Sequence, residues 1–272
     1  MRNHAYWHAV LIPCAAALLC SSPVRAAAPI GFAGTFSGNY QNVSSGGGAS
    51  GNVWGIDGAG AFGLNYPNLG AEIDGGYHNL SVSGFSADLW NIGGSLFWAG
   101  FPGRAGVTIG YDSVSGSVSG ATATANATTY GVFGEYYFSD MLTAGLKGGG
   151  SSGSGNAAGF GFSGSASGSG GYIGGGLTGY IMPDLALSAT ISYLSGSGHS
   201  TNFAVGAEYL FSDALPLTLS GGYMNTQVSG GHADTWLLAL TFYTGTGGTL
   251  RDHHRNGTLG WIGNSGIMES VH

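Results

Sequence analysis

The sequence predicts an all-β protein: a transmembrane, antiparallel, up-and-down β-barrel of about twelve strands, preceded by an N-terminal signal peptide. The first observation behind this prediction is composition, because glycine supplies 55 of 272 residues, aromatic residues 12% and charged residues only 7%. A soluble domain carries roughly 25% charged residues. Collagen would need glycine at every third position, and a disordered chain would have few aromatics. The other two observations are strand-length segments of alternating polarity and the regular spacing of the turns between them.

Residues 1–26 have the features of a signal peptide. They combine a basic residue near the start, an apolar run at residues 9–19, and the small residues Val24 and Ala26 at the two positions that signal peptidase reads. The alternative is a membrane anchor, but this run contains Pro13 and falls short of the roughly 20 residues that span a bilayer as a helix. We therefore expect cleavage after Ala26.

Removal of the signal peptide changes the cysteine count and the charge. Both cysteines, Cys14 and Cys20, lie inside it, so the mature chain can form no disulfide and no thiolate metal site. Loss of Arg2 and Arg25 leaves four basic residues against 13 acidic ones, a net charge of −9. Nucleic-acid binding depends on Lys and Arg that neutralise phosphates, so the composition argues against it.

Twelve segments of alternating polarity follow, as expected for strands of a membrane barrel. Short turns with Pro, Asn, Asp and Ser alternate with longer connections rich in Gly, Ser, Thr and Ala, such as residues 115–127 and 150–169. Outer-membrane barrels likewise have short periplasmic turns and longer external loops. The predicted strands are residues 31–42, 53–64, 69–79, 88–98, 104–114, 128–138, 141–149, 170–181, 184–194, 201–211, 215–225 and 233–243.

Alternation within the strands assigns their two faces. If charged side chains point inward, large apolar residues such as Trp54, Ile56, Trp236 and Leu238 point outward to lipid, while Gly, Ala, Ser and Thr fill the lumen. A soluble sandwich would bury the large residues instead. Residues 170–181 do not sort cleanly, because their large side chains fall on both faces.

Several motifs carry a family resemblance. Residues 134–140 (GEYYFSD) are echoed by residues 206–213 (GAEYLFSD), residues 90–98 read WNIGGSLFW, and residues 234–237 (DTWL) open the last strand. With these motifs, residues 35–243 resemble the small alphaproteobacterial outer-membrane β-barrel proteins, often called porin-like. The resemblance implies a barrel in the cell outer membrane, in contact with outer-membrane lipid, inserted by the barrel-assembly machinery and without enzymatic activity.

The C-terminus departs from this pattern. Such barrels usually end at an aromatic residue that closes the last strand and is read by the assembly machinery. Here that strand ends at Phe242 and Tyr243, and 29 further residues follow. We therefore expect the barrel at residues 31–243 and a periplasmic C-terminal extension at residues 244–272.

The sequence contains no convincing catalytic, cofactor or metal motif. Residues 58–63 match the pattern G-x-G-x-x-G, but such matches arise by chance at this glycine content, and no helix follows. A hydrolase would need a Ser or Asp beside a His, and nothing orients His78, which is the best candidate. A weak metal-site alternative rests on the separate histidines His78, His199 and His232 and on the adjacent His253 and His254, but solvated surface histidines explain them better.

The charges predicted to face the lumen are the candidate functional residues. Six acids against two bases would favour cations mildly if water fills the lumen. The alternative is that the same groups pair with one another and close a narrow lumen. These pore-lining candidates are Asp57, Glu72, Asp74, Arg104, Asp112, Glu135, Lys147 and Glu208.

Two functions remain open at this stage. One is a passive porin-like channel for small hydrophilic solutes with a mild preference for cations. The other is a non-conducting surface or structural barrel whose external loops bind partners. A secreted, soluble, glycine-rich β protein is a weaker third alternative.

Overall fold

The computed structural model describes residues 31–82, 85–100, 102–118, 120–159, 162–196, 198–212, 214–245 and 247–262. Twelve antiparallel strands pair in sequence order, and β1 pairs with β12, which closes the barrel. The predicted fold class and strand number are therefore confirmed. The predicted signal peptide at residues 1–26 lies outside the described residues.

All strands except β9 are longer than the sequence pattern suggested. Their bounds are β1 Phe32–Ser45, β2 Ser50–Gly63, β3 Leu69–Val82, β4 Phe85–Gly100, β5 Gly103–Val118, β6 Ala121–Ser139, β7 Leu142–Gly159, β8 Phe162–Met182, β9 Leu185–Ser195, β10 His199–Ser212, β11 Leu215–Val228 and β12 Gly231–Thr244.

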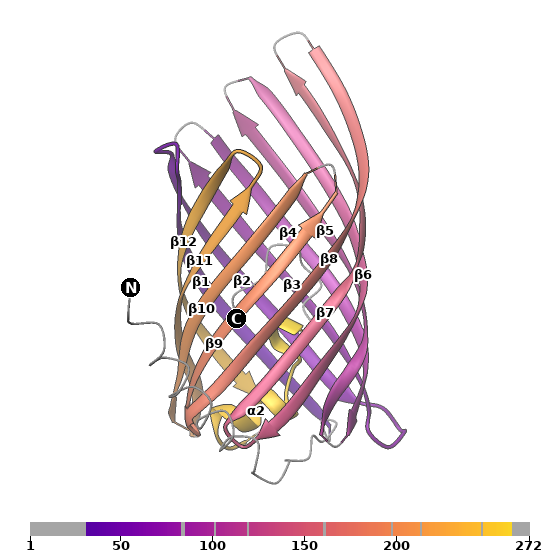
Figure 1. The fold of residues 1–272 in the computed structure, drawn as a ribbon, viewed down its shortest axis with the longest axis vertical. Coiled ribbons are helices and arrows are strands. Elements are labelled where there is room, and N and C mark those ends of the chain that lie inside the picture. Colours follow the sequence, from indigo (N-terminus) through magenta and orange to yellow (C-terminus); the bar gives the residue numbers. More distant parts are fainter. Residues whose placement is uncertain are drawn as a thin grey trace, which may run out of the picture.

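The prediction of long glycine-rich connections was wrong. Residues 150–169, expected to form a loop, continue β7 and β8 as a paired hairpin with register up to Gly159 opposite Phe162. Residues 115–127 likewise extend β5 and β6 up to Val118 opposite Ala121. Glycine and serine have low strand propensity, but continued hydrogen bonding to the neighbouring strand outweighs that preference. As a result β6, β7 and β8 rise above the rest of the barrel (Figure 1).

The two faces of the sheet sort as predicted. Large apolar side chains on the outer face are exposed, as at Ile109 (60%) and Trp236 (63%), whereas inward side chains such as Thr108 and Thr235 are buried. The segment that the pattern left ambiguous sorts equally well in β8, where Ile173 points outward and Tyr180 is buried inside. An apolar outer face around a polar interior is the arrangement of membrane-spanning barrels.

A polar and aromatic cluster recurs on the outer face at three neighbouring hairpins, close to the end opposite the short turns. In the hairpin of β3 and β4, Tyr77 Oη and Asn79 Nδ2 both donate to Asp88 Oδ1, and Trp90 lies opposite Tyr77. Tyr and Trp favour the interface between lipid and water, so these clusters mark one edge of the apolar band. The other two copies are Tyr40, Asn42, Asn52 and Trp54 in β1 and β2, and Tyr223, Asn225, Asp234 and Trp236 in β11 and β12.

After β12 the chain turns back toward the lumen. Gly245 and Gly248 have φ of 83° and 113°, and at Gly245 a Cβ atom would overlap the carbonyl oxygen of Phe32. The turn leads into helix α2 (Leu250–Asn256) and the short helix η1 (Gly260–Ile262) at the short-turn end of the barrel (Figure 1). Among the described residues, neither helix is long and apolar enough to cross a membrane.

Candidate functional site

Residues 249–262, here called the plug segment, occupy the lumen at the short-turn end. This position differs from the periplasmic extension expected for residues 244–272, of which only the part up to Ile262 is described. The difference has a physical origin: the wall offers buried acids and bases at this level, and the segment supplies carbonyl groups, an amide and basic side chains that pair with them. The pairing is described below contact by contact.

Helix α2 begins with a capping box. Thr249 Oγ1 accepts from the amide of Asp252, and the Asp252 carboxylate accepts from the amide of Thr249, at 3.3 and 3.1 Å. The next amide, of Leu250, donates to Asp184 in the turn between β8 and β9. The Leu250 side chain is fully buried against an inner cluster that includes Tyr180 and Leu210. The amide and the side chain of Leu250 therefore both anchor the helix to the wall.

Arg104 on β5 is the main polar contact between the wall and the plug segment. Its guanidinium lies 2.8 Å from Glu135 Oε2 on β6 and donates to the carbonyl oxygens of His254, Gly257 and Thr258. The side chain is 1% exposed. A buried guanidinium needs nearly all of its donors satisfied, and here the wall and the plug segment satisfy them together.

Arg255 forms the reverse contact, from the plug segment to the wall. Its guanidinium donates to the carbonyl oxygen of Ser139 at 2.6 Å and to Thr143 Oγ1 at 3.1 Å. It also lies over the rings of Tyr137 and Tyr180, 4.8 and 5.3 Å from their centroids. A charged side chain is thus held by hydrogen bonds and by cation–π contacts in a buried position.

Three further contacts continue along the plug segment. The amide of Leu259 donates to Glu72 Oε2 at 2.6 Å, and the Leu259 side chain packs in a buried cluster with Phe97 and Phe133. Lys147 Nζ donates to the carbonyl oxygen of Trp261 at 2.8 Å. Both polar and apolar groups therefore hold the segment in place.

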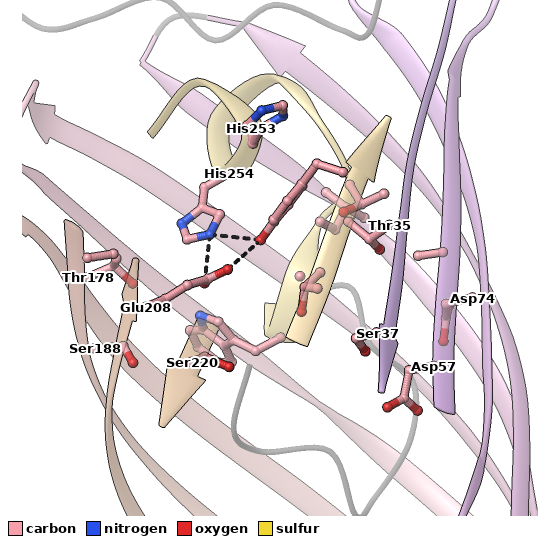
Figure 2. A pocket seen from close by; sticks show the side chains of 18 of the residues that line it. Thr35, Ser37, Asp57, Asp74, Thr178, Ser188, Glu208, Ser220, His253 and His254 are labelled. Carbon is pink, nitrogen blue, oxygen red and sulfur yellow. Dashed lines mark hydrogen bonds and ion pairs between the residues drawn. The ribbon is translucent and has the colours of Figure 1, made fainter. Parts of the chain in front are cut away.

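Glu208 on β10 is the centre of a second network. Its carboxylate accepts from Thr218 at 2.7 Å and from Tyr243 at 2.9 Å, and it lies 3.1 Å from His254 Nε2. Glu208, Tyr243 and His254 border a lumen cavity of about 140 Å³ (Figure 2). Figure 2 shows Asp57 on the opposite side of the cavity from Glu208.

All eight predicted side chains lie on the inner face, but they take part in different contacts. Arg104, Glu135, Glu72, Lys147 and Glu208 hold the plug segment or one another. The remaining three lie farther along their strands from the short-turn end. Asp57 lies 2.9 Å from His78 Nε2 and accepts from Asn39. Asp74 and Asp112 line the lumen on β3 and β5. The alternation of residues along each strand was thus enough to assign these side chains to the inner face.

The partners of these wall residues in the plug segment were not predicted. Arg255, His254 and Leu259 lie beyond the last strand, where alternation gives no information. One local signal is present: the spacing of Thr249 and Asp252 matches a capping box and predicts the start of a helix. Nothing local indicates that this helix enters the lumen.

The contacts also bear on the histidines. His254 is held by Glu208, Tyr180 and Tyr243, and His253 stacks on Tyr243 with ring centroids 4.7 Å apart. Within the described ranges, no group of three or more His, Cys, Asp or Glu side chains has the geometry of a metal site.

These features define a membrane β-barrel of the outer-membrane type with a folded segment inside its lumen. Its structure is similar to the translocator domain of the autotransporter NalP from Neisseria meningitidis, with a TM-score of 0.53 and 13% identity over 88% of this chain and 95% of that one. It is also similar to the β domain of the Bordetella autotransporter BrkA, with a TM-score of 0.54 and 9% identity over 78% of this chain and 98% of that one.

The KdgM porin aligns less well, with a TM-score of 0.47 and 13% identity over 76% of this chain and 98% of that one. No protein-family model matches the sequence, and no curated protein is similar to it in sequence. At these identities, the similarity to the two autotransporter domains supports the barrel fold alone.

Proposed function

We propose that the protein is an outer-membrane channel whose own C-terminal segment closes the lumen at the short-turn, periplasmic end. The observation that carries this proposal is the set of contacts between the plug segment and the wall, above all the buried Arg104 with its three carbonyl partners. An open porin of this size would leave water beside these charges. Here protein groups replace the water.

The charge of the lumen supports a preference for small cations when the segment is displaced. The wall contributes six carboxylates and two bases, and the plug segment adds Arg255. Without the plug segment the balance becomes more negative, which strengthens attraction of cations to a narrow pore. The solutes proposed are therefore small, hydrophilic and neutral or cationic.

The test is conductance in planar bilayers of the mature chain and of a variant that ends at Gly248. We expect low or no conductance from the full chain and frequent openings from the truncated one, with a reversal potential that indicates cation preference. A variant ending at Ile262 is the matched control, because it keeps every described contact of the plug segment. Heat-modifiable migration on gels confirms that each barrel is folded.

Equal conductance of the full chain and the variant ending at Gly248 would contradict closure by the plug segment. Silence of both folded proteins would favour the second candidate, a non-conducting surface barrel. The feature that favours this candidate is the projecting sheet of β6, β7 and β8, which carries small polar residues beyond the rest of the barrel (Figure 1).

A further inference from the structure

The outer half of the lumen contains an apolar chamber that the plug segment does not reach. Its volume is about 420 Å³, and the residues that line it lie toward the end of the barrel opposite the short turns. The expected lumen of Gly, Ala, Ser and Thr is wrong at this level, because large apolar side chains point inward. They include Val53, Leu80, Leu89, Val114, Met224 and Leu237.

Strand register brings several of these apolar side chains together in pairs. Val53 lies opposite Leu80 across β2 and β3, and Leu89 lies opposite Val114 across β4 and β5. The neighbouring Trp90 on β4 is 45% exposed on the outer face. The strands thus have large apolar residues on both faces here. A one-residue shift in register would only exchange the two faces, so it would still leave large apolar residues pointing inward.

Apolar side chains beside water in a pore carry a free-energy cost that a ligand can remove by covering them. Pockets for small molecules have volumes of roughly 300 to 1,000 Å³, with mostly apolar walls and a few polar groups that fix orientation. The chamber meets this description in size and in lining. The six apolar side chains are only half-buried, so their surfaces are accessible to a bound molecule.

The polar groups at the chamber indicate the charge of that molecule. Asp112 and His78 line it together with the amide side chains of Gln41, Asn91 and Asn126, and His78 contacts Asp57, which accepts from Asn39 at 2.6 Å. Among the described residues that line the chamber, none is Lys or Arg. The two basic wall residues, Arg104 and Lys147, contact the plug segment instead. The chamber therefore combines a mostly apolar lining with one carboxylate, that of Asp112.

We propose that this chamber binds small organic cations that have an apolar body and one ammonium group. The apolar body lies against the side chains on β2 to β5, β11 and β12, and the ammonium group points inward to Asp112. This site does not depend on whether the lumen conducts, because the chamber lies above the plug segment.

The test uses three probes that share one ring system and differ in charge: 2-naphthylmethylammonium, 2-naphthylmethanol and 2-naphthoate. Binding to the full mature protein in amphipol is measured by equilibrium dialysis. We expect the ammonium to bind most tightly, the alcohol next and the carboxylate weakest. Asp112→Asn should lower the affinity of the ammonium and leave that of the alcohol nearly unchanged, since only the ammonium uses the charge.

The apolar wall is tested with Leu89→Asn and Val114→Asn. Each should weaken both the ammonium and the alcohol by roughly tenfold, because an amide replaces apolar surface that the ring covers. Leu194→Asn is the matched control: Leu194 also faces inward on β9 but lines a different hollow, among Gly and Ser residues. It should bind the probes as the unaltered protein does.

Equal affinity for the three probes, or an unchanged affinity in folded Leu89→Asn and Val114→Asn proteins, would overturn the proposal. The variant ending at Gly248 separates it from the proposed function. If that variant binds the ammonium with unchanged order of affinities, the chamber is confirmed whatever the conductance measurement gives. If it loses the order, the site belongs to the plug segment and the chamber proposal is wrong.

Discussion

At the scale of single residues, the lumen is organised by buried charges that have partners on both the wall and the plug segment. Arg104 is the clearest case, since Glu135 supplies its charge partner and three carbonyl groups accept its remaining donors. Removing one member of a buried pair leaves the other charge without compensation, at a cost of about 3 to 5 kcal/mol. The stability of the plug segment in the lumen should therefore depend on this one side chain.

Arg104→Met tests this dependence. We expect the plug segment to leave the lumen, because three of its carbonyl groups lose their donor and Glu135 loses its charge partner. Limited proteolysis should cut residues 249–262 faster, and conductance should rise toward that of the chain ending at Gly248. Arg104→Lys is the control, since it keeps the charge but has fewer donors, and should fall between the two. Unchanged proteolysis in a folded Arg104→Met barrel would show that other contacts suffice.

At the scale of elements, β8 shows how closure of the sheet resolves an ambiguous strand. Its large residues fall on both faces in the sequence, but pairing with β7 and β9 fixes the register, with Gly148 opposite Ile173 and Leu194 opposite Tyr172. Ile173 is 62% exposed on the outer face, and Tyr172 is half-buried inside. A single residue of shift would exchange them.

Cysteine labelling tests this register. Both natural cysteines precede residue 21 and fall within the predicted signal peptide, so an introduced cysteine would be the single thiol of the cleaved chain. In vesicles, Tyr172→Cys should react with a water-soluble maleimide and Ile173→Cys should react poorly. A lipid-soluble maleimide should reverse the order. Equal reactivity of the two positions with both reagents would mean that β8 does not hold this register.

At the scale of the whole molecule, the barrel has an apolar outer face around an interior that is polar apart from the apolar chamber. The outer band is bordered on one side by the three Tyr, Asn and Trp clusters, and its middle carries aliphatic side chains such as Leu238 and Leu240. Lipid tails solvate such a band, whereas a charge placed in it loses its water. An arginine introduced on the outer face should therefore cost more stability than one introduced on the inner face.

Leu238→Arg should destabilise the folded barrel by about 2 to 4 kcal/mol, because it places a guanidinium in the lipid-facing band. Urea-induced unfolding in lipid vesicles measures the change. Ser220→Arg is the control, since Ser220 borders the lumen cavity, where acids are present to pair with the new charge. Similar loss of stability in both variants would contradict the assignment of the faces.

The sequence by itself determined the fold class, the strand number and the inner and outer faces. These properties are local, because alternation along one strand records which side meets lipid and which side meets water. Trp236 and Glu208 could each be assigned from their neighbours in the chain, and the structure places both as expected.

Only the tertiary structure decided the extension of β7 and β8, the apolar chamber and the position of the plug segment. Strand length depends on the hydrogen bonds offered by the adjacent strand, and the chamber requires side chains from opposite sides of the barrel. The position of residues 249–262 depends on Arg104, Glu72 and Glu208, which precede them by 40 residues or more. Such long-range pairing leaves no periodic trace in the segment itself, so it becomes visible only once the sheet has closed.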